Sequence, residues 1–264
     1  MNRYTKDLMD LFATRLKNYS LTNHCLILEI EDQEGKPFGV KLVFFREGIL
    51  RIQLGREFKQ LEYNLINPDY LIPSENVDFK EEANSLVVIH ESQRLVIGRD
   101  PFTFSLIAVD GHVIYEENFH DVNSVGEEGE DQIPPLGFSV DAAGCIANVN
   151  LCAALRHDEH IYGLGERFTE FDRRGQQIIL RNTDTLGCRD ESSYKNIPFY
   201  LSTYGYGLFL HTHVISEFNF GFESNASVSI HVPQDYLEYY LITGDNLKII
   251  LSRYMELTGP AVLP

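Results

Sequence analysis

The sequence predicts an all-β fold, in the form of a large antiparallel β-sandwich. Short segments rich in branched and aromatic residues recur along the chain, Gly or charged turns close them, and almost no helical periodicity lies between them. This spacing is typical of antiparallel sheets packed face to face. The 264 residues, 44% of them hydrophobic, are enough to bury a sizeable core.

The first expected element is a short N-terminal helix over residues 5–17, because Leu8, Leu11, Phe12 and Leu16 recur there at helical spacing. Strands follow from residue 25 onward. Asp110-Gly111 suits the positive φ angles of a hairpin turn between two of them. The expected strands cover residues 25–30, 40–45, 49–54, 86–90, 95–97, 102–109, 146–151, 177–181, 199–203, 207–212, 217–220, 228–232 and 237–242.

The end of the chain predicts a helix over residues 245–257, where apolar residues form one helical stripe. Asp245 or Thr243 can cap its start, and Gly259-Pro260 supplies a stop. We therefore expect a sandwich over residues 1–242 and a connector helix within residues 243–264.

The charge and the absence of apolar segments restrict the function classes. A formal net charge of −17 disfavours nucleic acid and anionic lipid as partners, and the sequence contains no basic patch to offset it. No window approaches the roughly 20 apolar residues that span a bilayer, and the first thirty residues lack a signal-peptide pattern. A cytoplasmic protein without membrane contact is expected. The four cysteines lack metal-ligand spacing, so no metal and no cofactor is expected.

The densest run of polar residues and glycines covers residues 162–185. Its Gly-Leu-Gly is not a dinucleotide fingerprint, because the third Gly is missing and no helix pattern follows. Glu166 beside Arg167, and Asp172 beside two arginines, are interpreted as structural ion pairs that orient a loop. An acid–base site is the alternative interpretation.

Asp184 is the better functional candidate in this run. It follows an apolar strand and is flanked by Asn182, Thr183 and Thr185, which can exchange hydrogen bonds with sugar hydroxyls. An Asx-type turn is the competing structural interpretation. His211 and His213, two apart on an expected strand, would share a face, but without a third ligand they are interpreted as ordinary strand residues.

Six blocks in this order resemble family 31 glycoside hydrolases of the α-xylosidase and α-glucosidase type. The blocks are Ile161–Phe168, Asn182–Asp184, Tyr194–Tyr200, Gly205–Phe209, Leu237–Tyr240 and Tyr254–Gly259. The resemblance implies a galactose-mutarotase-like sandwich that precedes a (β/α)8 barrel. It also implies that the aspartate nucleophile and the acid/base aspartate of this retaining reaction lie beyond Pro264.

The resemblance assigns to this region a loop that reaches over the barrel and lines the sugar subsites. Asp184 matches the aspartate of that loop and Thr185 follows it, so both are expected to bind substrate. The chain is then a non-catalytic domain of an α-xylosidase or α-glucosidase that is itself inactive. Its expected partners are the barrel and an α-linked oligosaccharide or glycoside, and the full-length enzyme can oligomerise.

Two other functions compete with this hypothesis. A free-standing carbohydrate-binding module would use exposed aromatic platforms, often Trp, and the chain has no Trp. A mutarotase-like enzyme would need a general acid and base at the sugar anomeric centre. His211 or His213 with Glu217 could serve, but no motif supports that pairing.

Overall fold

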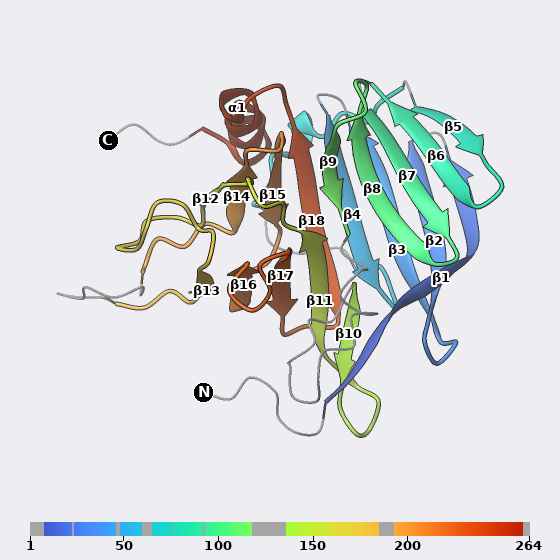
Figure 1. Ribbon diagram of the computed structural model, residues 1–264, viewed down its shortest axis with the longest axis horizontal. Coiled ribbons are helices and arrows are strands. Elements are labelled where there is room, and N and C mark those ends of the chain that lie inside the picture. Colours follow the sequence, from blue (N-terminus) through green and yellow to red (C-terminus); the bar gives the residue numbers. More distant parts are fainter. Residues whose placement is uncertain are drawn as a thin grey trace.

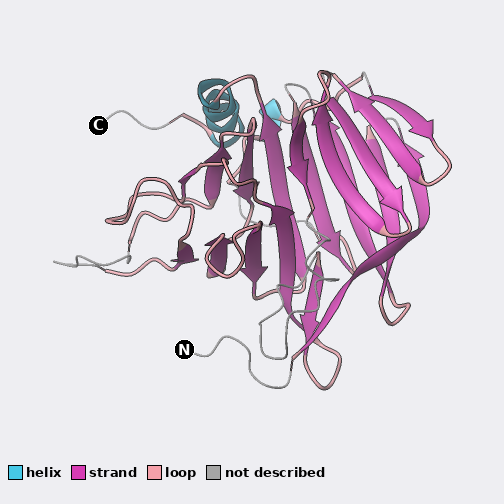
Figure 2. Ribbon diagram, in the orientation of Figure 1, coloured by secondary structure: helices cyan, strands magenta, loops and turns pink. Residues whose placement is uncertain are grey.

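The computed structural model describes residues 8–22, 24–45, 48–59, 65–75, 77–91, 93–117, 136–184 and 193–260. Strands dominate it, and a 3-10 turn η1 (Pro68–Tyr70) and a helix α1 (Leu247–Thr258) accompany them (Figures 1 and 2). The strands are β1 (Met9–Thr22), β2 (Cys25–Asp32), β3 (Pro37–Phe45), β4 (Ile49–Gly55), β5 (Val77–Glu81), β6 (Ser85–His90), β7 (Gln93–Arg99), β8 (Phe102–Ala108), β9 (Val113–Glu116), β10 (Gly137–Val140), β11 (Ile146–Ala154), β12 (Ile161–Gly163), β13 (Gln177–Leu180), β14 (Phe199–Ser202), β15 (Tyr206–Leu210), β16 (Ser216–Phe220), β17 (Ser227–Val232) and β18 (Tyr236–Thr243).

The named strands form two antiparallel sheets. One has the order β12-β14-β15-β18-β4-β3-β2-β1-β10-β11-β17-β16-β13, and the other has the order β5-β6-β7-β8-β9. The long strand β1 joins the two halves of the larger sheet, because its first half pairs with β10 and its second half with β2. The antiparallel sandwich predicted from strand periodicity is confirmed.

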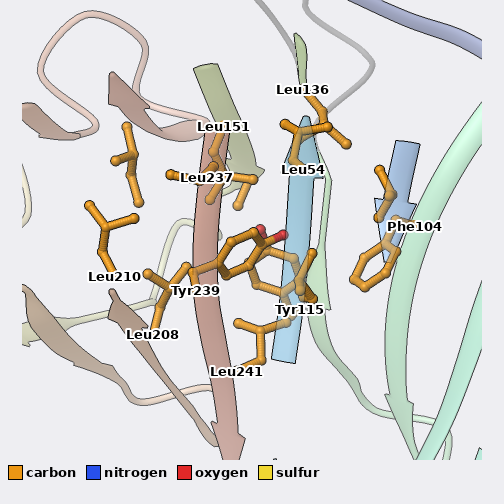
Figure 3. Close-up of a cluster of buried hydrophobic side chains, with 14 of the residues drawn as sticks. Leu54, Phe104, Tyr115, Leu136, Leu151, Leu208, Leu210, Leu237, Tyr239 and Leu241 are labelled. Carbon is orange, nitrogen blue, oxygen red and sulfur yellow. The ribbon is translucent and has the colours of Figure 1, made fainter. Parts of the chain in front are cut away.

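One hydrophobic core fills the space between the layers. Alternate residues of each strand enter it, as β18 illustrates with Leu237, Tyr239 and Leu241 (Figure 3). The intervening residues Tyr240 and Ile242 point to the opposite face and join a second apolar cluster. Both faces of β18 are therefore buried, which explains its nearly continuous apolar sequence.

Helix α1 covers that second face, as the C-terminal pattern predicts. Ile250 and Leu257 are its buried residues, and the ring of Tyr254 stacks on Phe199 with centroids 3.8 Å apart. Its cap differs from the expectation, because the Asn246 side chain accepts the amide hydrogen of Ile249 at 3.1 Å. No helix in the described ranges is long and apolar enough to cross a membrane.

The expected N-terminal helix is wrong, because residues 9–22 form strand β1. Leu11 and Ala13, two positions apart, enter the core, so burial follows a period of two. Backbone pairing with β10 and β2 satisfies the amides and carbonyls of this segment. Long-range pairing thus overrides the local helical spacing of its leucines.

Candidate functional site

Three segments between β12 and β14 meet at one end of the sandwich. They are the turn that follows β12, the exit of β13 at residues 181–184, and the segment 193–198 that leads into β14 (Figure 1). Asn182 bridges Ser193, and the amide of Thr183 donates to the carbonyl of Ser193 at 3.1 Å. Three of the six sequence blocks therefore contribute to a single site.

Gly165 allows the β12 turn to lie directly against the segment that leads into β14. Its φ is +84°, and a Cβ at this position would lie 1.9 Å from the carbonyl oxygen of Lys195. The Glu166 amide, next in the chain, donates to that same carbonyl at 3.1 Å. The Gly-Leu-Gly sequence is thus a close-packed structural turn.

The charged residues of this turn orient the loop, but their partners are not their sequence neighbours. Glu166 forms a 2.9 Å ion pair with Lys195, and its hydrogen bond raises the pKa of the Lys195 ammonium. The Arg167 guanidinium donates to Asn196 Oδ1 and, at 3.4 Å, to the carbonyl of Leu164. Glu166 therefore pairs with Lys195 and not with its neighbour Arg167, the partner expected from the sequence.

Asp172 anchors the base of the same loop. Its carboxylate lies 2.6 Å from His160 Nδ1 and accepts the amides of Ile161 and Arg174 at 3.2 and 3.1 Å. Partial burial would raise its pKa, but these hydrogen bonds outweigh burial and lower the pKa of Asp172. Arg173 is buried and donates to the Gly163 carbonyl at 3.0 Å. Asp172 therefore acts as a structural anchor.

Asn196 joins the three segments through its side-chain amide. Its Oδ1 accepts from Arg167, and its Nδ2 donates to Asn182 Oδ1 at 2.7 Å and to the Ser193 carbonyl at 3.0 Å. Two of these contacts reach the β12 turn and the β13 exit, and the third stays within the segment 193–198. The two residues before Asp184 are thus bonded to the segment 193–198, which Arg167 contacts in turn.

Asp184 is exposed at the end of this anchored segment. Within the described ranges its carboxylate accepts no hydrogen bond, in contrast to Asp172. Thr185 and residues 186–192 lie outside the described residues, so the expected role of Thr185 stays a prediction. Three aromatic side chains of these segments are also exposed to solvent. Phe168, Phe171 and Tyr194 are 73%, 76% and 65% exposed.

The two histidines considered as metal ligands do not share a face. Strand β15 ends at Leu210, before both of them, and His211 is buried whereas His213 is exposed. His211 Nδ1 lies 2.7 Å from Glu238 Oε1. The pairing of a histidine with Glu217, considered from the sequence, stays an untested alternative. No group of three or more His, Cys, Asp or Glu side chains in the described part of the chain could hold a metal ion.

Sequence reasoning missed Asn196 and Lys195 as parts of this site. Both lie inside a block that carries the family resemblance, and the pair Lys195-Asn196 is polar in an otherwise apolar stretch. A polar pair of this kind is the signal that could have identified them. Which residues they contact depends on how β13 and β14 are placed, and the sequence does not reveal that.

Comparisons with known proteins show the family of this chain. The family model for the glycosyl hydrolase 31 N-terminal galactose mutarotase-like domain matches residues 39–219, more than half of the chain. The alpha-xylosidase XylQ of Lactiplantibacillus pentosus is 45% identical over 107 residues, which are 40% of this chain and 14% of that protein. An alpha-xylosidase of Emericella nidulans is 36% identical over 151 residues, which are 55% of this chain and 19% of that protein.

Solved structures show the same fold over nearly the whole chain. A GH31 dextranase of Flavobacterium johnsoniae, complexed with glucose, has a TM-score of 0.79 at 24% identity and covers 96% of this chain and 29% of the dextranase. A GH31 alpha-xylosidase from a soil metagenome, complexed with xylose, has a TM-score of 0.71 at 21% identity and covers 94% of this chain and 36% of that one. The chain spans a small part of the length of each relative, and it belongs to the family of glycosyl hydrolase 31 N-terminal galactose mutarotase-like domains.

Proposed function

We propose that this chain is the non-catalytic N-terminal domain of a retaining α-xylosidase or α-glucosidase, and that it supplies a substrate-binding loop. The observation that carries the proposal is the exposed Asp184, which follows a segment anchored through Asn196. The two alpha-xylosidase relatives described above favour a xyloside or glucoside as substrate.

The exposed aromatic side chains of the loop after β12 and of the segment before β14 support a docking role for this end of the sandwich. Large exposed apolar groups that gather at one place favour burial against another protein surface. In the proposal, Phe168, Phe171 and Tyr194 contact the catalytic barrel, while Asp184 reaches past them toward the sugar. Residues 1–242 form the sandwich in this arrangement, and residues 243–264 connect it to the barrel.

The experiment compares the full-length enzyme with its Asp184→Ala variant on an aryl glycoside and on a natural disaccharide. A lost hydrogen bond between a carboxylate and a sugar hydroxyl lowers kcat/KM about 10- to 100-fold. Asp78→Ala is the matched control, because Asp78 is an exposed carboxylate on the distant strand β5. Unchanged kinetics of Asp184→Ala on both substrates would exclude the role in substrate binding.

The isolated chain is proposed to be inactive. A retaining double displacement needs two carboxyl groups about 5–5.5 Å apart on either side of the scissile bond. In this proposal both of them belong to the catalytic barrel and not to the 264 residues of this chain. Incubating the 264-residue chain with an aryl α-xyloside and an aryl α-glucoside should release no aglycone above the buffer rate. Turnover that scales with the concentration of the chain would contradict this.

A further inference from the structure

A polar hollow of about 440 Å³ opens at the edge of the sandwich where α1 begins. It is lined by the β6–β7, β8–β9 and β14–β15 turns and by the connection from β18 to α1, which lies at the upper edge of Figure 1. We call it the edge hollow and define it by Glu91, Gln93, Asp110, His112, Tyr204 and Asp245.

The edge hollow is separate from the Asp184 loop. Strand β14 begins at Phe199, just after the segment that contacts Asn182, and ends at Ser202, just before the hollow. Four strand residues span roughly 13 Å at about 3.3 Å per residue, so the two places lie at opposite ends of this strand. A ligand in the edge hollow therefore does not require Asp184.

The floor of the edge hollow is a buried hydrogen-bond network. Thr243, 2% exposed, donates its hydroxyl to the carbonyl of Gly48 at 3.0 Å and accepts from the Gln93 side-chain amide. Glu91 Oε2 accepts the Gly48 amide at 2.9 Å. Arg253 donates to the Thr243 carbonyl. Polar groups held in this way are fixed before any ligand arrives.

One wall of the edge hollow is a pair of rings in fixed orientation. The rings of His112 and Tyr204 lie 5.1 Å apart with an interplanar angle of 32°. The Tyr204 hydroxyl donates to Asp158 at 2.5 Å, and the Arg156 guanidinium lies 5.0 Å from the Tyr204 ring centroid. His112 is exposed, so the pair presents ring surface to a ligand. Ring surfaces of this kind pack against the C–H face of a sugar.

The charges of the edge hollow select a neutral ligand rich in hydroxyl groups. The lining residues include three carboxylates, those of Glu91, Asp110 and Asp245, and one guanidinium, that of Arg253, so phosphate and carboxylate ligands are disfavoured. Carboxylates accept hydrogen bonds from hydroxyl donors. The volume lies in the range of about 300–1,000 Å³ that is typical of small-molecule sites. We propose that the edge hollow binds one residue of a neutral saccharide, at a site distinct from the Asp184 loop.

The test is an NMR titration of the 264-residue chain with xylose, glucose and isomaltose. We expect saturable shifts with a Kd of about 1–20 mM, the range for a small ligand held by few contacts. His112→Ala and Asp245→Asn should each weaken binding at least about fivefold, which is the loss of one modest contact. Asp184→Ala and His157→Ala should leave it unchanged, since the His157 side chain is 95% exposed and does not line the hollow.

Each contrary outcome overturns the proposal in a distinct way. Binding lost in Asp184→Ala but kept in His112→Ala would place the sugar on the Asp184 loop. Tighter binding of methylammonium than of any sugar would make the hollow a cation site, and no saturable shift would remove the site altogether. Thermal unfolding of each variant verifies its fold, and Asp245→Asn keeps the test valid if His112→Ala unfolds. None of these outcomes tests the proposed role of Asp184 in the full-length enzyme, which the kinetic comparison above tests separately.

Discussion

The Asn196 side-chain amide donates a 2.7 Å hydrogen bond to the side-chain carbonyl of Asn182. Asn182 lies two residues before Asp184, so this bond joins the exit of β13 to the segment that leads into β14. The same amide group accepts from Arg167. The Asn196 side chain thus helps to fix the position at which the Asp184 loop begins.

Asn196→Asp should weaken the attachment of the β13 exit to the segment that leads into β14. An aspartate still accepts from Arg167 but donates no hydrogen bond, so the bonds to Asn182 and Ser193 are lost. We expect about 1–2 kcal/mol of destabilisation and faster hydrogen exchange at the amide of Thr183. Asn84→Asp is the control, because it loses one comparable bond, to the Asp100 carbonyl, in the smaller sheet. Unchanged exchange at Thr183 would show that the backbone alone holds this segment.

Gly165→Ala should disrupt the contact between the β12 turn and the segment before β14. The added Cβ would meet the Lys195 carbonyl oxygen at 1.9 Å, and backbone atoms cannot move aside without breaking the turn. We expect a loss of about 2–4 kcal/mol in unfolding free energy, measured by chemical denaturation.

Gly175→Ala is the matched control for this prediction. Gly175 also has a positive φ, of +77°, but a Cβ there meets nothing within 4 Å. Only the left-handed backbone conformation is penalised, at about 1 kcal/mol. Equal losses in the two variants would mean that backbone strain, and not the close approach, determines the effect at Gly165.

Strand periodicity was sufficient to predict the sandwich, because inward-facing residues such as Leu237, Tyr239 and Leu241 alternate along each strand. The same approach predicted the wrong element for the N-terminal segment, a helix in place of strand β1. The spacing of Leu8, Leu11 and Leu16 fits a helix locally, and only pairing with β10 and β2 makes it a strand. Pairing partners distant in sequence are invisible to local pattern analysis.

The sequence indicated Asp184 as the candidate residue, but it did not reveal which residues hold the segment before it. The position of Asp184 after an apolar strand, with Asn182 and Thr183 before it, indicated a polar loop. Asn196 contacts Asn182 only because the end of β13 lies beside the segment that leads into the start of β14. Contacts of this kind arise from topology, which no residue pattern in either segment encodes.

Tyr254→Ala should release α1 from the sheet. The Tyr254 ring stacks on Phe199 at an interplanar angle of 3° and meets Phe209 edge-on at 5.4 Å. Removing a half-buried aromatic ring from an apolar cluster costs about 3 kcal/mol. We expect faster hydrogen exchange throughout residues 247–258. Leu251→Ala, at a 41% exposed position of the same helix, should change exchange little, and equal effects would argue against the stacked pair as the anchor.

Glu117 makes the stability of the sandwich depend on pH. Its side chain is 3% exposed, and it accepts a 3.0 Å hydrogen bond from Tyr115, whose ring lies with that of Tyr239 in the core (Figure 3). Burial raises the pKa of Glu117 from 4.5 to about 8, although hydrogen bonds from Tyr115 and Tyr239 act in the opposite direction. The folded chain therefore keeps this proton at pH values where the unfolded chain has lost it.

The sign of the effect follows from proton linkage. Below pH 4.5 both states hold the proton, and the contribution of Glu117 to stability is fully present. As the pH rises toward 8, only the unfolded chain ionises, so the free energy of unfolding falls by up to about 1.4 kcal/mol per pH unit. Glu117→Gln removes this slope, and the variant should gain a few kcal/mol relative to the wild type between pH 5 and pH 8. Denaturant unfolding at several pH values measures the difference. Glu57→Gln, at an exposed carboxylate, is the control, and its free energy of unfolding should depend on pH as that of the wild type does. If Glu117→Gln showed the same pH dependence as the wild type, Glu117 would already be ionised inside the folded core.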